Sequence, residues 1–266
     1  MTKIGFRRRP KRNRAGQGAR RVATEEHIRT PQGATRKRAP EGGIGYHAEM
    51  RDLSTACERS AANDPLNDPR IRVLHGVLEQ RPPRVLDPDP RVSRAAVSLV
   101  VRPGSDDLEI LLIQRTASDH DPWSGHMALP GGRHQGDEED LDTAIRETLE
   151  EVGVDLASEG MLIGRLDDVS PAHNGPRIAV APFVFAVPAQ TKVVPEPAEV
   201  AETVWIPIRH LADPTSAAEH LHVLPNGGSL RFPAFAYDRY VIWGLTHRML
   251  IQFLGIARTI QQGESS

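Results

Sequence analysis

Several short runs in the middle of the chain have the apolar pattern of buried strands. Residues 94–101 read RAAVSLVV and residues 108–114 read LEILLIQ, and the turn-forming sequence PGSDD lies between them. Apolar runs at residues 161–169, 177–187 and 203–208 predict further strands. The pattern therefore predicts a sheet that begins near residue 94, with the first two strands forming a hairpin.

Apolar residues recur at helical spacing in three flanking segments. Residues 68–80 predict a helix that packs at the edge of the domain, and residues 207–212 predict a short helix. Residues 240–261 predict a long helix, whose apolar stripe consists of Ile242, Leu245, Met249 and Phe253. We assign Trp243 and this stripe to the core rather than to a ligand.

The segment 130–154, PGGRHQGDEEDLDTAIRETLEEVGV, combines a glycine turn, a loop and an amphipathic helix. On a helical wheel the core face consists of Leu141, Ile145, Thr148, Leu149 and Val152, and the opposite face of Glu147, Glu150 and Glu151. Carboxylates three and four residues apart on a helix repel one another unless a cation lies among them. Mg²⁺ prefers oxygen ligands and is held by a few carboxylates together with substrate phosphates. The spacing therefore predicts a metal site on this helix.

Residues before the acidic face have roles that support such a site. Gly131 and Gly132 let the backbone turn sharply, which can bring a main-chain carbonyl to the metal. Glu138 can form a bidentate pair with Arg146 that fixes the acidic side chains. The alternative is a solvated acidic helix in which Arg146 pairs with Glu150, but this interpretation explains neither the glycines nor Glu138.

The positions Gly132, Glu138, Arg146-Glu147, Glu150-Glu151 and Gly153-Val154 have the spacing of the Nudix box, the signature of Nudix hydrolases. The segment resembles this box throughout except at Thr148, where an aliphatic residue is usual. The resemblance implies an α/β fold, an α/β/α sandwich in which a mixed sheet lies between the box helix and the C-terminal helix. It also implies hydrolysis of a phosphoanhydride in a nucleoside diphosphate linked to a group X, with Mg²⁺ or Mn²⁺ as cofactor.

The resemblance assigns roles to residues of the box, and the chemistry of residues in the flanking segments adds further candidates. The metal ligands are Gly132, Glu147, Glu150 and Glu151. The catalytic residues are Glu147, Glu150, Arg146 and Glu199. Either Glu147 or Glu199 accepts the proton of the attacking water, and Glu202 is a further candidate ligand or base. The substrate-binding candidates are Arg115 for phosphate, Trp123 for stacking on a base, and His126 and His173 for hydrogen bonding or positioning.

Residues outside the box resemble the coenzyme A diphosphatase branch of the family. Leu111, Leu112, Arg115, Gly125 and Pro130–Gly132 keep the shape of its signature, and EPAEVAETVWIPI (196–208) and IWGLT (242–246) are also similar. The departures are Leu129 in place of Phe, Thr116 in place of Ser or Ala, one inserted residue before Gly125, and a missing second Arg, with His120 nearest. We expect coenzyme A or its derivatives as substrate, cleaved to 3′,5′-ADP and 4′-phosphopantetheine. Nucleoside diphosphate sugars or other nucleotides are the alternative, followed by a non-catalytic nucleotide sensor.

The net charge of −2 is the sum of a basic N-terminal part and an acidic remainder of the chain. Residues 1–40 carry thirteen Lys and Arg against Glu25 and Glu26, and the rest of the chain is acidic. Because the basic part is rich in Gly, Pro and Arg, we expect residues 1–49 to form a disordered arm. An RNA-binding tail, a passenger arm and a gene start at Met50 remain alternatives. The expected domains are this arm, a linker with a packing helix (50–90), the Nudix hydrolase domain (91–262) and a disordered tail (263–266).

Composition narrows the expected location and partners. No apolar run approaches the roughly 20 residues of a membrane span, and the lone Cys57 suits a reducing compartment. We therefore expect a cytoplasmic protein whose partner is a small-molecule nucleotide and which does not bind a membrane. The sequence does not determine whether the protein forms a homodimer. We do not expect nucleic acid as a partner, although the basic arm does not exclude it.

Deleting residues 1–49 should leave kcat and KM on a small nucleotide substrate within about threefold of the parent values, because the removed charge acts only through a long-range field that salt screens. Steady-state kinetics at about 0.15 M ionic strength tests this expectation. Loss of folding on deletion would contradict it, and a selective loss of activity on RNA would favour the RNA-binding alternative.

Overall fold

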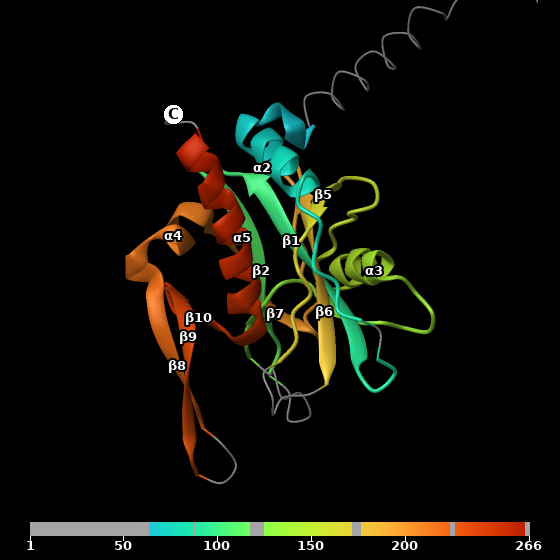
Figure 1. Ribbon diagram of the computed structural model, residues 1–266, viewed down its shortest axis with the longest axis vertical. Coiled ribbons are helices and arrows are strands. Elements are labelled where there is room, and N and C mark those ends of the chain that lie inside the picture. The colour runs from blue at the N-terminus through green and yellow to red at the C-terminus, as the bar shows by residue number, and fades with distance from the viewer. Residues whose placement is uncertain (1–63, 88, 118–124, 172–176, 224–226, 264–266) are drawn as a thin grey trace, which may run out of the picture. The chain divides into compact units, whose positions relative to one another are not determined.

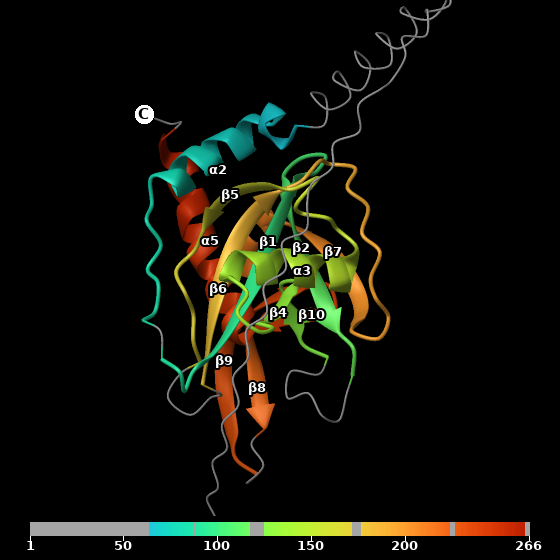
Figure 2. The same cartoon turned by 90° about the vertical axis from the view of Figure 1, so that its right-hand side faces the viewer.

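The computed structural model describes residues 64–87, 89–117, 125–171, 177–223 and 227–263. The expected arm (1–49), most of the linker before the packing helix and nearly all of the tail lie outside these residues. Within them, the chain forms a seven-stranded mixed sheet, a separate three-stranded sheet and helices on both faces of the larger sheet (Figures 1 and 2).

The larger sheet has the strand order β3-β2-β1-β6-β5. Its strands are β1 (Ser93–Pro103), β2 (Leu108–Arg115), β3 (Met127–Ala128), β4 (Gly131–Arg133), β5 (Met161–Arg165), β6 (Ile178–Ala186) and β7 (Val200–Pro207). β1 and β6 are parallel, and the other pairs of this sheet are antiparallel. β1 pairs with β4 along its first half and with β2 along its second half, which places the glycine strand β4 directly beside the centre of the sheet.

Two hydrophobic cores lie on the two faces of the larger sheet, because successive side chains of a strand point to opposite faces. Leu99 of β1 belongs to the core under α2 (Pro69–Glu79) and α5 (Gly244–Gly263), whereas Val100 belongs to the core under α3 (Asp140–Val152). Figure 1 shows α3 and α5 on opposite sides of the sheet. The predicted α/β/α sandwich is therefore confirmed.

Helix α2 lies where the periodicity of residues 68–80 predicts a helix. The Asp68 carboxylate accepts a hydrogen bond from the backbone N–H of Arg70 (2.8 Å), and Pro69 occupies the first turn, so the helix has a regular N-terminal cap. Ile71, Leu74 and Leu78 are buried in the core shared with α5. The helix covers the edge of the sheet near β5, which is the packing role that its sequence predicts.

The C-terminal segment differs from the prediction of one helix over residues 240–261. Residues Tyr240–Trp243 form strand β10, and α5 begins at Gly244, whose φ of 68° suits glycine at the change from strand to helix. β10 pairs with β9 (Ser229–Tyr237), which pairs with β8 (Ala217–Val223), and the short helix α4 (Ile208–Ala212) precedes them. The run YVIW is apolar enough for either element, so its pattern alone does not distinguish them. Trp243 consequently lines a cavity, although Met249 and Phe253 are in the core as predicted.

The box helix α3 is rotated relative to the predicted wheel. Leu149 is 47% exposed instead of buried, and Glu151 is almost completely buried. The hydroxyl of Thr148 donates to the Ala144 carbonyl oxygen (2.7 Å) and lies within hydrogen-bond distance of Ser98 Oγ of β1 (2.8 Å). This polar contact holds Ala144, Thr148 and Glu151 towards the sheet, so Leu149 turns outward. It also explains why threonine is accommodated where an aliphatic residue is usual.

Candidate active site

The glycine strand β4 lies in tight contact with both β1 and the box helix. A Cβ atom on Gly131, whose φ is 147°, would collide with the backbone of Ala96 and Val97. A Cβ atom on Gly132 would collide with the carboxylate of Glu147. From the sequence we expect these glycines to allow a sharp turn. The structure shows that the close packing of β4 against β1 and α3 also requires them. The assignment of the Gly132 carbonyl as a metal ligand remains a prediction.

Arg146 binds three glutamates of the box. Its Nε and Nη2 atoms donate to Glu138 at 3.1 and 2.8 Å, and its Nη1 atom donates to Glu147 at 2.8 Å and to Glu150 at 2.9 Å. The hydrogen bonds that Arg146 donates to Glu138 hold the pKa of Glu138 at about 2 and raise the pKa of Arg146. The bidentate pair between Glu138 and Arg146, predicted from their spacing, is present. Glu138 of the loop thus holds the Arg146 guanidinium in place, and Arg146 in turn orients the Glu147 carboxylate.

Glu151 is a buried carboxylate beside the glycine strand. Its side chain is only 1% exposed. Its Oε2 atom accepts a hydrogen bond from the backbone N–H of Gly131 at 2.8 Å, and its Oε1 atom lies 3.5 Å from Arg115 Nη1. Burial raises the pKa of Glu151 to about 7 although Gly131 and Arg115 favour the charged form, and Glu147 and Glu199 add repulsion. The side chain is therefore poised between its neutral and charged forms near neutral pH.

Glu147 and Glu199 extend the acidic cluster. Burial raises the pKa of Glu147 against the effect of Arg146, and Glu150 and Glu199 raise it further by repulsion. Glu199 is exposed and belongs to the segment that leads into β7; its carbonyl oxygen accepts a hydrogen bond from the N–H of Thr116 at 2.9 Å. The structure thus brings Glu199 within electrostatic range of Glu147 and Glu151.

Glu202 has a different environment from Glu199. Its Oε2 atom accepts hydrogen bonds from the Tyr240 hydroxyl and from Arg239 Nη2, each at 2.6 Å, and these bonds lower its pKa. This carboxylate therefore connects β7 to β10 of the three-stranded sheet. Its contacts argue against the candidate role of Glu202 as a metal ligand or general base.

The acidic cluster fits a divalent cation in the chemistry of its donors. Glu147 and Glu151 have pKa values raised mainly by burial and further by repulsion from neighbouring glutamates, and a cation near them would relieve this repulsion. Yet no group of three or more His, Cys, Asp or Glu side chains in the described part of the chain is arranged around a common metal position. Glu150 is 52% exposed and bound to Arg146, so it must exchange this partner to join Glu147 and Glu151 as a ligand.

A second charged network, which the sequence did not reveal, anchors the start of α3. Asp140 forms ion pairs with Arg94 of β1 and with Arg165 of β5. Both arginines also contact Asp168, whose side chain is fully buried, at 3.0 and 2.7 Å. Burial is the largest single influence and opposes ionisation of Asp140. The Arg94 hydrogen bond and the charges of Arg94, Arg165 and His134 together outweigh it, and the pKa of Asp140 is lowered. This network ties the box helix to the two strands beneath it and so fixes the acidic face relative to the sheet.

The predicted substrate-binding residues are only partly brought together. Arg115, at the end of β2, reaches the acidic cluster through Glu151. His126 instead contacts Trp243 and His220, with ring centroids 4.8 and 6.4 Å away. Trp123 and His173, and also His120, lie outside the described residues.

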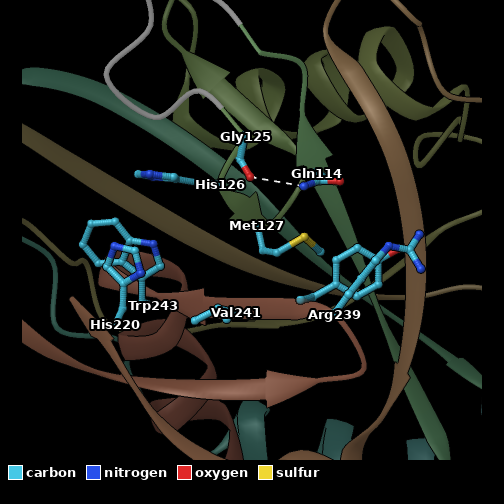
Figure 3. Close-up of a pocket in the computed structure, with 9 residues that line it drawn as sticks. Gln114, Gly125, His126, Met127, His220, Arg239, Val241 and Trp243 are labelled. Carbon is cyan, nitrogen blue, oxygen red and sulfur yellow. Dashed lines mark hydrogen bonds between the residues drawn. The ribbon is translucent and has the colours of Figure 1, made fainter. Parts of the chain in front are cut away.

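A cavity of about 310 Å³ next to His126 was also not predicted from the sequence. It lies between the β2–β3 edge of the larger sheet and the three-stranded sheet, and its lining includes Gln114, Met127, His220, Arg239 and Trp243 (Figure 3). The alternation of AAEHLHV over residues 217–223 is the signal that could have predicted β8 and placed His220 and His222 on one face.

The fold and the site define an α/β/α protein with an acidic helix packed beside a glycine strand. Residues 92–227, half of the chain, match the NUDIX domain, and the chain therefore belongs to the Nudix hydrolase family. Within the described residues, no helix is long and apolar enough to cross a membrane.

The chain is also similar to individual curated proteins and solved structures. The chain is 44% identical over 110 residues, 40% of its length, to an uncharacterized protein of Schizosaccharomyces pombe. It is 31% identical over 189 residues, 66% of its length, to the mitochondrial Nudix hydrolase 15 of Arabidopsis thaliana. The matches span 33% and 63% of these two proteins. A MutT/nudix family protein from Enterococcus faecalis aligns in structure with a TM-score of 0.45 and 15% identity, over 68% of this chain and 66% of that chain.

Proposed function

We propose that the chain hydrolyses a phosphoanhydride bond in nucleoside diphosphate derivatives and requires a divalent cation. The observation that carries this proposal is the cluster of Glu147, Glu151 and Glu199 beside β4, with Glu147 oriented by the Arg146–Glu138 pair. Nudix hydrolases generally act on such substrates with divalent cations. A structural acidic helix would not need a buried carboxylate whose pKa is raised to about 7.

The chain's own residues would divide the work of hydrolysis among them. Glu147, Glu150 and Glu151 would hold Mg²⁺ or Mn²⁺, which neutralises diphosphate charge and lowers the pKa of bound water. Arg146 keeps Glu147 directed at the site. Glu147 or Glu199 accepts the proton of the attacking water. Arg115, whose guanidinium already lies 3.5 Å from Glu151, is placed to bind a phosphate oxygen.

Coenzyme A and its derivatives are the substrates that we propose first. The support is the sequence resemblance at Leu111, Leu112, Arg115, Gly125 and Pro130–Gly132, together with the position of Arg115 beside the acidic cluster. The absence of the second arginine lowers the expected affinity for the substrate phosphates, because a neutral histidine cannot replace the bidentate hydrogen bonds of a guanidinium group. Nucleoside diphosphate sugars and related nucleotides are therefore the second candidate class.

A kinetic screen should show coenzyme A cleavage to 3′,5′-ADP and 4′-phosphopantetheine, with kcat/KM at least comparable to that for ADP-ribose and for a nucleotide sugar. Purified full-length protein is assayed with Mg²⁺ and with Mn²⁺, and products are identified by mass spectrometry. A coenzyme A kcat/KM about a hundredfold below that for another nucleotide, equal to about 2.7 kcal/mol of transition-state binding, would reject coenzyme A as the substrate. Hydrolysis of none of these compounds would reject the proposed activity itself.

A further inference from the structure

We propose that the cavity between the β2–β3 edge and the three-stranded sheet binds the nucleobase of the substrate, stacked against the rings that close one end of it. This proposal deepens the proposed function and rests on it for the identity of the ligand as a nucleotide. The three-stranded sheet that completes the cavity consists mainly of residues beyond the NUDIX match, which ends at residue 227.

One end of the cavity is a wall of flat rings. Trp243 of β10 and His220 of β8 are stacked, with centroids 3.9 Å apart and planes inclined by 18°. The ring of His126 meets Trp243 edge-on at 4.8 Å. Burial and the nearby His222 lower the pKa of His220, so the imidazole is neutral at pH 7. An uncharged wall of this kind suits the face of a heteroaromatic base, because base stacking on aromatic side chains is strong and tolerant of the base's identity.

The polar groups of the cavity lie away from this wall. Figure 3 shows Gln114 on the β2 side and Arg239 at the end opposite Trp243 and His220. The Gln114 amide donates to the Gly125 carbonyl oxygen over 3.4 Å, a long bond that can be exchanged for one to a base edge. A glutamine amide can both donate to and accept from adenine. Arg239 is 61% exposed and pairs with Glu202, and exposed pairs of this kind are weak enough to rearrange around a phosphate.

The size of the cavity favours one end of the substrate over the whole molecule. Ligand sites typically enclose about 300–1,000 Å³, and this cavity of about 310 Å³ is at the lower limit. It is therefore suited to a nucleoside rather than to a complete coenzyme A or dinucleotide. The remainder of such a substrate must extend out of the cavity.

The route from the cavity to the acidic cluster is short along the chain. Gln114, which lines the cavity, is followed by Arg115, whose guanidinium contacts Glu151. The backbone N–H of Arg115 donates to the carbonyl oxygen of His126, another residue of the cavity, at 3.1 Å. The pairing of β2 with β7 shifts register between Gln114 and Arg115 at this point. The side chains of Gln114 and Arg115 point to opposite faces of the sheet. A substrate whose base lies in the cavity must therefore pass around the end of β2 to bring its phosphates to Arg115 and the glutamates.

The test compares two non-hydrolysable probes, AMP and ribose 5-phosphate, which differ only in the base. Binding to full-length protein is measured by calorimetry in the presence of Mg²⁺. Val241→Trp fills the cavity from its β10 side, and Trp243→Leu removes the stacking wall. Leu221→Trp is the matched control, because Leu221 is an exposed residue of β8 that points away from the face carrying His220.

The parent and Leu221→Trp should bind AMP at least about tenfold more tightly than ribose 5-phosphate, as expected for one stacked base. In Val241→Trp and Trp243→Leu this ratio should fall below about threefold, with thermal unfolding confirming that both variants are folded. A ratio near one in the parent, or a ratio that both variants retain, would overturn the base site. AMP contains no phosphoanhydride, so its binding tests the base site independently of hydrolysis. If the parent binds AMP at least about tenfold more tightly than ribose 5-phosphate but hydrolyses no nucleotide, the base site is supported and the proposed activity is rejected.

Discussion

Glu151→Gln should lower kcat/KM on the cleaved nucleotide by about 10²- to 10³-fold while the protein remains folded. The substitution removes a carboxylate charge that a divalent cation needs, and charge stabilisation by a bound cation contributes several kcal/mol to such reactions. Glu150→Gln should also reduce activity, but by less, because Glu150 is half exposed and bound to Arg146, whereas Glu151 is buried at the glycine strand.

Glu159→Gln is the matched control for the Glu151 experiment, since it makes the same chemical change at an exposed position after the box helix. Its kinetics should equal those of the parent. Thermal unfolding in the presence of a chelator separates a functional role from a structural one. If metal-free Glu151→Gln and Glu150→Gln are both less stable than the metal-free parent, the carboxylates are structural and the metal-site interpretation is wrong.

The parts of the site that the sequence predicts are those fixed by local geometry. Glu138 and Arg146 are eight residues apart, and their bidentate pair follows from one loop and two turns of helix. The two faces of the larger sheet follow from alternation along β1, where Leu99 and Val100 enter different cores. In both cases the side-chain directions are set by backbone periodicity alone.

The parts that the sequence does not predict depend on contacts between distant segments. A helical wheel gives the apolar arc of α3 but not which edge of it meets the sheet. In the structure Thr148 contacts Ser98 of β1, Glu151 is buried and Leu149 is exposed. The cavity joins residues of β2 and β3 to residues of β8 and β10, about a hundred positions later in the chain. The pattern of Tyr240–Trp243 fits a strand or a helix equally well. The prediction of a helix places Trp243 in the core, whereas it lies in strand β10 and lines the cavity.

The metal-free protein should lose stability as the pH rises from about 4.5 to about 7, relative to a variant that lacks the Glu151 carboxyl group. Burial raises the pKa of Glu151 from 4.5 to about 7, so the folded state binds more protons than the unfolded state within this window. The free energy of unfolding therefore falls with increasing pH until the folded carboxyl group has ionised. At about 1.4 kcal/mol per pKa unit, the full loss attributable to Glu151 is about 3 to 4 kcal/mol.

Urea unfolding at pH 5 and pH 8 with a chelator measures this loss for the parent, Glu151→Gln and the control Glu159→Gln. Titrating groups that do not interact with Glu151, including Glu138 with its lowered pKa, are common to all three proteins and cancel in the comparison. The repulsion of Glu151 by Glu147 is lost in Glu151→Gln and is part of the measured difference. The parent and Glu159→Gln should lose about 2 to 3 kcal/mol more than Glu151→Gln between the two pH values, because part of the linkage lies below pH 5. Equal losses in all three proteins would show that Glu151 is not held in a desolvated site. Adding Mg²⁺ should stabilise the parent more at pH 8 than at pH 5, because only the ionised carboxylate can serve as a ligand.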